Sequence, residues 1–260
     1  MQIITEADVL ATYNRKDPTS EELVADYREY QDYTQEHPDE GPTLISRALD
    51  MPLGRIKEWH NGVQPDGYRA ISFLDENGWF DAMPASTTNS INRLIAWLLA
   101  SGCVQTQGFR PRFTLHDSED IYRLSSGLRN LGLKHDVQHR EGRPDEVTIP
   151  EWSSVAGRAF AAAGVPIGND HYQVDTLPGY LNYATTTMRR VFIEIFLLTR
   201  AGEAPEPWAT KIELRPTRPA TYIDDFETLC RQEGGRSHVE RAGRDIFFSP
   251  VALERITEES

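Results

Sequence analysis

Apolar and polar residues along the first 80 positions recur at helical intervals. A Thr/Ser start followed by two glutamates at 19–22 is typical of a helix N-cap. Gly62 and Gly78 follow two of the apolar patterns and predict helix ends. The segment 81–90 is rich in small polar residues and predicts a linker, so we place a domain boundary near residue 84. The predicted helices lie at about 19–38, 43–50, 53–61 and 68–80.

Beyond this boundary the pattern of predicted elements occurs twice. Each copy reads as an apolar helix, a strand, a second helix and a hairpin. Equivalent residues keep a nearly constant spacing, because Gly102 and Gly202 are 100 positions apart and Phe113 and Ile212 are 99 apart. The first copy has its elements at 89–102, 109–116, 118–132 and 135–150, the second at 185–202, 209–215, 221–235 and 237–250, with a helix at 151–164 and a linker at 165–180 between them.

The composition predicts a soluble protein with sizeable cores. The chain has 260 residues, of which 39% are hydrophobic. Its longest apolar runs fall well short of the roughly 20 residues that a membrane-spanning helix needs, and no signal-peptide pattern is present, so we expect a cytoplasmic protein. The two cysteines, Cys103 and Cys230, lack the spacing of a metal site and are interpreted as ordinary thiols.

The net charge bears on which partners the chain can have. It carries 40 acidic and 27 basic side chains, a formal charge of −13, which repels polyanions at low salt. Only 4 of the 27 basic residues are Lys and 23 are Arg. This skew, with the acidic surface, suggests a salt-rich cytoplasm, as in halophilic archaea, where screening limits the field of a charge to a few ångströms. The overall acidity then does not exclude DNA as a partner, and local patches of charge decide whether the chain can bind it.

The segment 43–62 resembles a helix-turn-helix. Five apolar residues fall where two steeply crossing helices need contacts, and Ser46 is small enough to let the helices approach. Asp50 stands where this turn usually has glycine, and Asp tolerates left-handed backbone better than most residues. The alternative is a small helical module that contacts other proteins. The five apolar residues are Ile45, Leu49, Met51, Ile56 and Trp59.

The second helix of this segment carries polar residues that suit DNA. Side chains of these types reach phosphates and hydrogen-bond to base edges in the major groove. Glu58 on the same helix opposes such contact. One unit of this size gives little specificity, so we expect a second contact surface or dimerisation. The candidate DNA-contact residues are Arg55, Lys57, His60 and Asn61.

Two glycine-ended apolar runs, LIAWLLASG at 94–102 and EIFLLTRAG at 194–202, match the signature of LAGLIDADG homing endonucleases in length and final glycine. With the doubled pattern of elements, residues 86 to 250 resemble that family. The resemblance implies an α+β chain, with an N-terminal helical helix-turn-helix domain before a pseudo-two-fold αββαββα saddle. The signature helices would pack at its centre and the sheets would lie along the major groove. The predicted domains are 1–84, 85–178 and 179–260, the last two being the repeats.

The predicted strands at 109–116 and 209–215 alternate between apolar and polar residues, as half-buried strands do. We interpret both polar faces as basic on balance, which favours a sheet that faces the DNA groove. A solvated edge that carries arginine is the alternative. Arg140 and Arg143, at the hairpin tip, are further candidates for phosphate contact. The candidate DNA-contact residues of the saddle are Arg110, Arg112, His116, Lys211, Arg215 and Arg218.

Cleavage in this family, as the resemblance implies, needs a metal-binding carboxylate just before the final glycine of each signature run. Those positions hold Ser101 and Ala201 here. Glu203 is one residue beyond Gly202, and Glu194 lies roughly 10 Å along the helix from Ala201. We therefore predict no catalytic residue, no metal site and no cofactor.

The sequence favours a sequence-specific DNA-binding protein that acts as a transcriptional regulator, with double-stranded DNA as partner and no membrane. The saddle is pseudo-dimeric within one chain, and the oligomeric state stays open. Two alternatives remain: an active metal-dependent homing endonuclease that uses Glu203, and an RNA maturase. His135 and His139, four apart in a predicted hairpin, are interpreted as surface residues rather than metal ligands.

Overall fold

The computed structural model describes residues 2–13, 16–81, 85–117, 119–168, 174–215 and 218–258. The chain divides into two compact units. One is Thr5–Glu76, and the other consists of Met1–Ile4 with Asn77–Ser260. The sequence analysis places the boundary near residue 84, whereas the units divide between Glu76 and Asn77.

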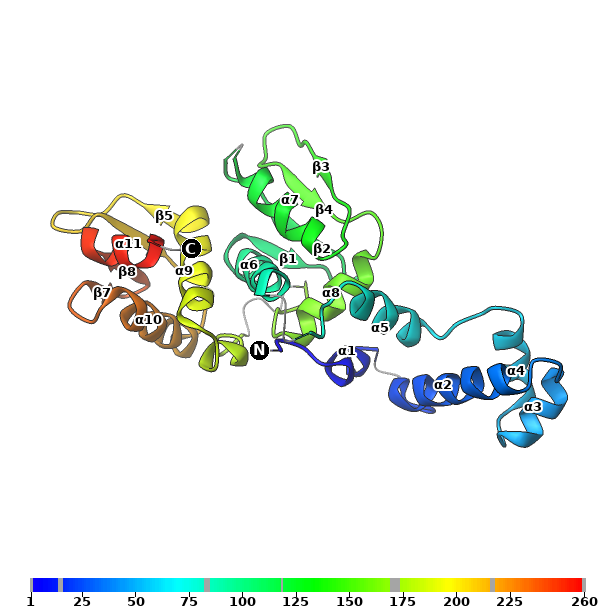
Figure 1. The fold of residues 1–260 in the computed structure, drawn as a ribbon. Helices are drawn as coiled ribbons and strands as arrows, with labels where there is room; N and C mark the ends of the chain where they lie inside the picture. Colours follow the sequence, from blue (N-terminus) through cyan, green and yellow to red (C-terminus); the bar gives the residue numbers. More distant parts are fainter. Residues whose placement is uncertain are drawn as a thin grey trace. The chain divides into compact units, whose positions relative to one another are not determined.

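The unit Thr5–Glu76 is helical and has an aromatic core. Tyr27 on α2 meets Trp59 on α4 edge-on, with ring centroids 5.1 Å apart. Helix α2 begins at a capping box in which Thr19 and Glu22 satisfy each other's backbone N–H groups. The core residues are Tyr27, Tyr30, Ile45, Met51, Ile56 and Trp59. The helices are α1 (Glu6–Ala11), α2 (Ser20–Glu36), α3 (Pro42–Ala48), α4 (Leu53–His60) and α5 (Asp66–Glu76) (Figure 1).

A tight turn joins α3 to α4. Asp50 has φ of 52°, which confirms that Asp takes the left-handed conformation usually filled by glycine. The Ser46 hydroxyl donates a hydrogen bond to the Met51 carbonyl at 2.6 Å, so the small residue also closes the turn. Local side-chain chemistry thus fixes how α4 leaves α3.

Substitutions at Asp50 test this turn. Asp50→Val places a β-branched residue at positive φ and is expected to lower the free energy of unfolding of Thr5–Glu76 by about 1–2 kcal/mol. Asp50→Gly relieves the strain and is expected to cause no loss. Urea unfolding monitored by tryptophan fluorescence measures both. Equal stability of the two variants would contradict the role given to the positive φ.

The larger unit contains two four-stranded antiparallel sheets with the same strand order. The orders are β1-β2-β4-β3 and β5-β6-β8-β7, which confirms the predicted repetition. Helices α6, α7 and α8 lie with the first sheet, and α9, α10 and α11 with the second (Figure 1). The first half has α6 (Ala85–Ser101), β1 (Gly102–Val104), β2 (Pro111–Thr114), α7 (Asp120–Asn130), β3 (Asp136–Gln138), β4 (Glu146–Thr148) and α8 (Ser153–Ala162). The 3-10 helix η2 (Gly179–Asn182) precedes a second half with α9 (Thr186–Arg200), β5 (Ala201–Gly202), β6 (Thr210–Glu213), α10 (Ala220–Gly234), β7 (Val239–Ala242), β8 (Asp245–Phe248) and α11 (Pro250–Thr257).

The two glycine-ended apolar runs are the ends of α6 and α9, which pack against each other. Every residue from Leu94 to Ala100 is buried, so the first run is core on all sides. Asn92 is also buried, and its amide donates to the Met188 carbonyl of α9 at 2.9 Å, while the Tyr180 hydroxyl donates to the Asn92 side-chain oxygen at 2.7 Å. This satisfied polar link fixes the pairing of two otherwise apolar helices.

The strand register shows which residues of the two halves are equivalent. Gly102 pairs with Phe113, and Ala201 pairs with Ile212. Because Phe113 and Ile212 hold matching places in their sheets, Ala201, and not Gly202, is the counterpart of Gly102. The residue before it, at the end of each helix, is therefore Ser101 in the first half and Arg200 in the second. This corrects the sequence alignment of the two runs, which matched them by their glycines.

The two glycines also differ in how much space surrounds them. A Cβ added to Gly102 would lie 2.6 Å from the Arg112 carbonyl oxygen and 2.9 Å from the Leu98 Cα, both backbone atoms. A Cβ on Gly202 would meet only the end of the Lys211 side chain, at 3.9 Å. The glycine is required in the first half alone.

Gly102→Ala is therefore expected to lower the free energy of unfolding by about 1–3 kcal/mol, because backbone must move to admit the methyl group. Gly202→Ala, its matched control, is expected to stay within about 0.5 kcal/mol of the wild type. Chemical denaturation of the two variants side by side measures the difference. A similar loss in both would contradict the difference in space around the two glycines.

Candidate nucleic-acid interface

Helix α4 has two polar sides. Lys57, His60 and Asn61 are exposed at its C-terminal end, as a surface available to a partner requires. Arg55 lies on the other side, where its guanidinium makes an ion pair with Asp26 of α2 at 2.5 Å. It also lies 5.8 Å from the centre of the Trp59 ring. The structure thus groups three of the four candidate residues of this unit and assigns Arg55 to packing against α2.

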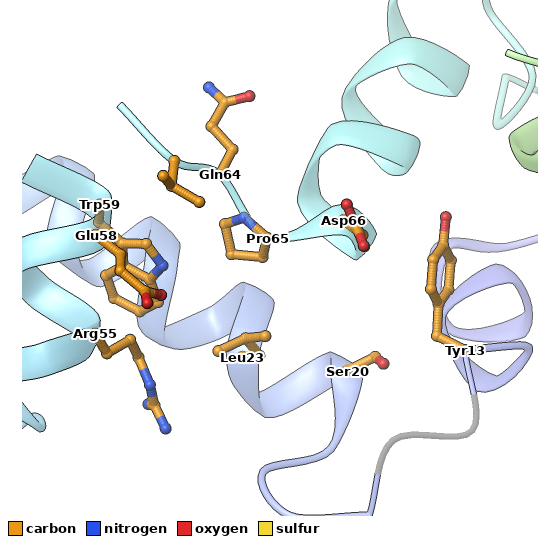
Figure 2. A pocket seen from close by; sticks show the side chains of 11 residues that line it. Tyr13, Ser20, Leu23, Arg55, Glu58, Trp59, Gln64, Pro65 and Asp66 are labelled. Atoms are coloured by element: carbon orange, nitrogen blue, oxygen red, sulfur yellow. The ribbon is translucent and has the colours of Figure 1, made fainter. Parts of the chain in front are cut away.

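Arg55 lines an open pocket of about 710 Å³ within this unit. Figure 2 shows Arg55 and Glu58 of α4 on one side of the pocket and Asp66 and Tyr13 on the other. Trp59 and Pro65 also line the pocket (Figure 2). The Arg55 side chain therefore lies against Asp26 of α2 and beside this pocket.

The charge of the helical unit opposes DNA at low salt. Residues Thr5–Glu76 contain 16 acidic and 7 basic side chains, a net charge of −9 out of −13 for the whole chain. Much of the acidity lies on α2, which has exposed Glu29, Asp32 and Glu36. The three grouped candidate residues therefore form a small polar patch on a strongly acidic unit.

The exposed faces of both sheets carry acids that sequence reasoning did not count. Arg112 of β2 pairs with Glu146 of β4 at 3.0 Å. In the second sheet, Lys211 of β6 pairs with Asp245 of β8 at 2.8 Å. The predicted basic balance is therefore wrong for the sheet faces, because the neighbouring strands place Glu146, Asp136, Asp245 and Glu240 beside the cations.

The cations at the strand ends and in the turn of the first sheet lie in different surroundings. Arg110 is exposed just before β2. Arg140 reaches Glu146 at 2.9 Å, so this carboxylate is shared by two arginines. Arg143 is exposed in the turn between β3 and β4. Arg110 and Arg143 are therefore the exposed candidate cations at the strand ends of the first sheet.

Two arginines of the second half bind the C-terminal end of α6. Arg200 Nε donates to the Ala100 carbonyl at 2.6 Å, and Arg218 Nη2 donates to the Leu99 carbonyl at 2.8 Å. The last carbonyls of a helix lack intrahelical partners and carry partial negative charge, so guanidinium groups stabilise this end. Arg218 is only 3% exposed and stacks 4.4 Å from the Tyr222 ring centre. The buried Arg218 side chain therefore stabilises the packing of the second half against α6. This corrects the prediction that Arg218 contacts a phosphate.

Further cations gather beside these two. Arg244 Nη1 donates hydrogen bonds to the carbonyls of Arg215 and Arg218, at 3.1 and 2.8 Å. Burial, then the charges of Arg215 and Arg218, lowers the pKa of Arg200 to about 10. Burial and, next, the charge of Arg200 also lower the pKa of His116. The negative charge of Asp120 acts in the opposite direction and raises this pKa. We call Arg200, Arg215, Arg218 and Arg244 the central arginine cluster. His116 of the first half lies close enough for the charges of Arg200 and Arg215 to act on it.

Sequence reasoning found Arg215, Arg218 and His116 but missed Arg200 and Arg244. Arg200 stands inside the quoted run EIFLLTRAG. The 99-residue offset of Phe113 and Ile212, applied to the helix ends, would have identified it as the counterpart of Ser101. Arg244 lies in a hairpin tip whose partner carbonyls belong to another loop, so no local pattern marks it.

Helices α6 and α9 end at Ser101 and Arg200, and neither residue is a carboxylate. Ser101 is 3% exposed and its hydroxyl has no hydrogen-bond partner, while its counterpart is the cation Arg200. Glu203 is exposed after β5, and Glu194 lies within α9. Among the residues that the structure describes, no three His, Cys, Asp or Glu side chains gather as a metal site. A guanidinium at this position repels a divalent cation.

The two histidines at a spacing of four do not share a site. His135 lies 2.8 Å from the Ser125 hydroxyl, and His139 lies 2.8 Å from Asp145. Each ring therefore has its own polar partner.

In the described part of the chain, no helix is both long and apolar enough to cross a membrane. No family model and no curated protein matches the sequence. Among solved structures, the chain is similar to one described as the N-terminal LAGLIDADG domain of DUF199/WhiA, with 12% sequence identity and a TM-score of 0.44. The match covers 73% of this chain and 92% of that one.

Proposed function

We propose that this chain is a sequence-specific double-stranded-DNA-binding protein that acts as a transcriptional regulator and does not cut DNA. In this proposal α3 and α4 form a helix-turn-helix, and the two-sheet unit is a LAGLIDADG-like saddle. The observation that carries it is the pair of residues at the ends of the central helices. Ser101 and Arg200 stand there, and neither supplies the anionic ligand that metal-assisted cleavage needs.

The helical unit supports the DNA-reading part of the proposal. The tight turn at Asp50 sets α4 off from α3, and the exposed end of α4 carries Lys57, His60 and Asn61. Asn reads adenine edges and Lys contacts phosphates or guanine in the major groove. These three residues are the proposed base and backbone contacts.

The saddle supports binding without cleavage. Its cations concentrate where the two halves meet, while the sheet faces themselves are charge-balanced by Glu146 and Asp245. Such a surface holds a backbone phosphate at its centre but supplies no metal-activated water. The saddle would therefore add affinity to the contacts made by α4.

Selection of bound sequences from a random duplex pool, at molar KCl, tests the proposal. A specific motif should emerge in EDTA as well as in Mg²⁺, with no nicking of plasmid that carries it. Recovery of no motif would refute sequence-specific binding. Cleavage in Mg²⁺ or Mn²⁺ that disappears in Glu203→Gln would establish the endonuclease instead.

Variants of α4 test the reading helix. Asn61→Ala is expected to weaken binding to the selected motif by about 5–150-fold, the range for loss of one base contact. Arg28→Ala, on the side of α2 that pairs with Glu6 of α1, removes a charge from the same unit and should change affinity less than threefold. Equal effects of the two would remove α4 from the interface.

A further inference from the structure

Arg200 and Arg244 of the central arginine cluster differ from several other cations of the larger unit in what their guanidinium groups bind. Arg112, Lys211 and Arg241 each form an ion pair with a carboxylate. Arg200 and Arg244 instead donate to backbone carbonyls, of Ala100 and of Arg215 and Arg218. A carbonyl satisfies a donor but does not cancel its charge. Arg200 and Arg244 therefore keep positive charge, and the opposing charge of Glu213 acts on Arg200 less strongly than the neighbouring Arg215 and Arg218 do.

The cluster also draws on both halves of the saddle. Arg200 ends α9 and Arg215 follows β6, both in the second half, while His116 follows β2 in the first. The charges of Arg200 and Arg215 lower the pKa of His116, so the three groups lie near one another where the halves meet. A ligand bound at this place contacts both copies of the repeat.

The chemistry of the cluster suits a tetrahedral oxyanion. A guanidinium carries five N–H donors in a fixed fork, and Arg200 uses Nε on the Ala100 carbonyl. Arg–phosphate pairs are short, charge-assisted and frequently bidentate. Half-buried Arg200 and Arg215 and exposed Arg244 leave the cluster reachable from solvent. A divalent cation is repelled by the same charges.

We infer that the central arginine cluster binds a phosphodiester group of the DNA, so that arginine side chains replace the metal ions of a cutting saddle. This inference rests on the proposed function for the identity of the partner. It goes beyond that function in assigning the residues Arg200, Arg215 and Arg244, with His116, to one phosphate at the junction of the halves. Arg218 positions the cluster from beneath.

Two variants and one control separate this site from general electrostatics. Arg215→Gln and Arg244→Gln each remove one charge from the cluster. Arg236→Gln removes one exposed charge from the turn between α10 and β7. This turn leads into an edge strand of the same sheet. Circular dichroism and thermal unfolding in chloride establish that all three fold as the wild type does, and whichever cluster variant folds carries the test.

Inorganic phosphate is the first probe. At equal ionic strength, replacing chloride by phosphate should raise the unfolding midpoint of the wild type and of Arg236→Gln by about 2 °C or more. The rise should be at most half as large in the cluster variants. General exclusion of phosphate from protein surfaces acts on all four proteins alike, so only the difference counts. An equal rise in all four proteins would overturn the site.

The selected duplex DNA is the second probe. Loss of one phosphate contact by Arg215→Gln is expected to weaken binding about tenfold, and Arg236→Gln less than threefold. If the wild type binds no DNA, the proposed function and this inference fall together. If the wild type and Arg215→Gln bind DNA equally, the inference alone fails and the DNA-binding function stands.

Discussion

Affinity for DNA is expected to rise about tenfold as KCl increases from 0.1 to 1 M, where most DNA-binding proteins lose affinity. The reason is the acidic unit that carries α4, with a net charge of −9. The Debye length falls from about 10 Å at 0.1 M salt to about 3 Å at 1 M. Repulsion between the acids of α2 and the DNA is then screened, while the direct contacts proposed for Lys57 and Asn61 persist.

Fluorescence anisotropy with the selected duplex measures this dependence. The triple variant Glu29→Gln, Asp32→Asn, Glu36→Gln removes three exposed acids of α2 and should bind more tightly than the wild type at 0.1 M KCl. Its affinity should change less with salt, and the two proteins should converge at 1 M. An ordinary decrease of affinity with salt in the wild type would contradict this account of the net charge.

Arg218→Ala is expected to lower the free energy of unfolding of the larger unit by about 3–5 kcal/mol. The side chain is almost fully buried, donates to the Leu99 carbonyl at 2.8 Å and stacks on Tyr222. Its removal leaves a buried carbonyl at the end of α6 without this partner and opens a cavity beside the ring.

Urea unfolding of the full chain measures the effect. Arg236→Ala, an exposed arginine of the same half, is the control and should stay within about 0.5 kcal/mol of the wild type. Arg218→Lys keeps the charge but loses the planar fork, so an intermediate loss is expected. Equal stability of Arg218→Ala and Arg236→Ala would mean that Arg218 contributes nothing to the central packing.

Periodicity in the sequence predicted much of the fold. The helix spacing of 19–38, the break between the helices at 43–50 and 53–61 and the doubled pattern after residue 84 correspond to α2, to the α3–α4 turn and to the two sheets of identical order. These features are local or repeat along the chain, so they can be read without knowing what packs against what. The conformation of Asp50 was predictable for the same reason.

The candidate site was harder to predict, because it depends on contacts between distant segments. Arg112 and Lys211 look basic within their own strands, and only the pairing with β4 and β8 reveals their carboxylate partners. In the sequence, Arg218 resembles a surface cation in a loop. The Leu99 carbonyl that accepts its hydrogen bond is 119 residues away. Charge balance across a sheet and burial of a polar side chain are tertiary properties that a single sequence does not display.

The shared register has a consequence for the two halves as building blocks. The Leu115 amide bonds to the Asp145 carbonyl just as the Leu214 amide bonds to the Arg244 carbonyl, so His116 matches Arg215 and Asp145 matches Arg244. With Ser101 in the place of Arg200, three arginines of one copy correspond to a hydroxyl, an imidazole and an acid in the other. The halves are therefore unlike in charge at these positions, and a homodimer of either half would carry two sets of guanidinium groups or none. The covalent link between the copies keeps one of each in the same molecule.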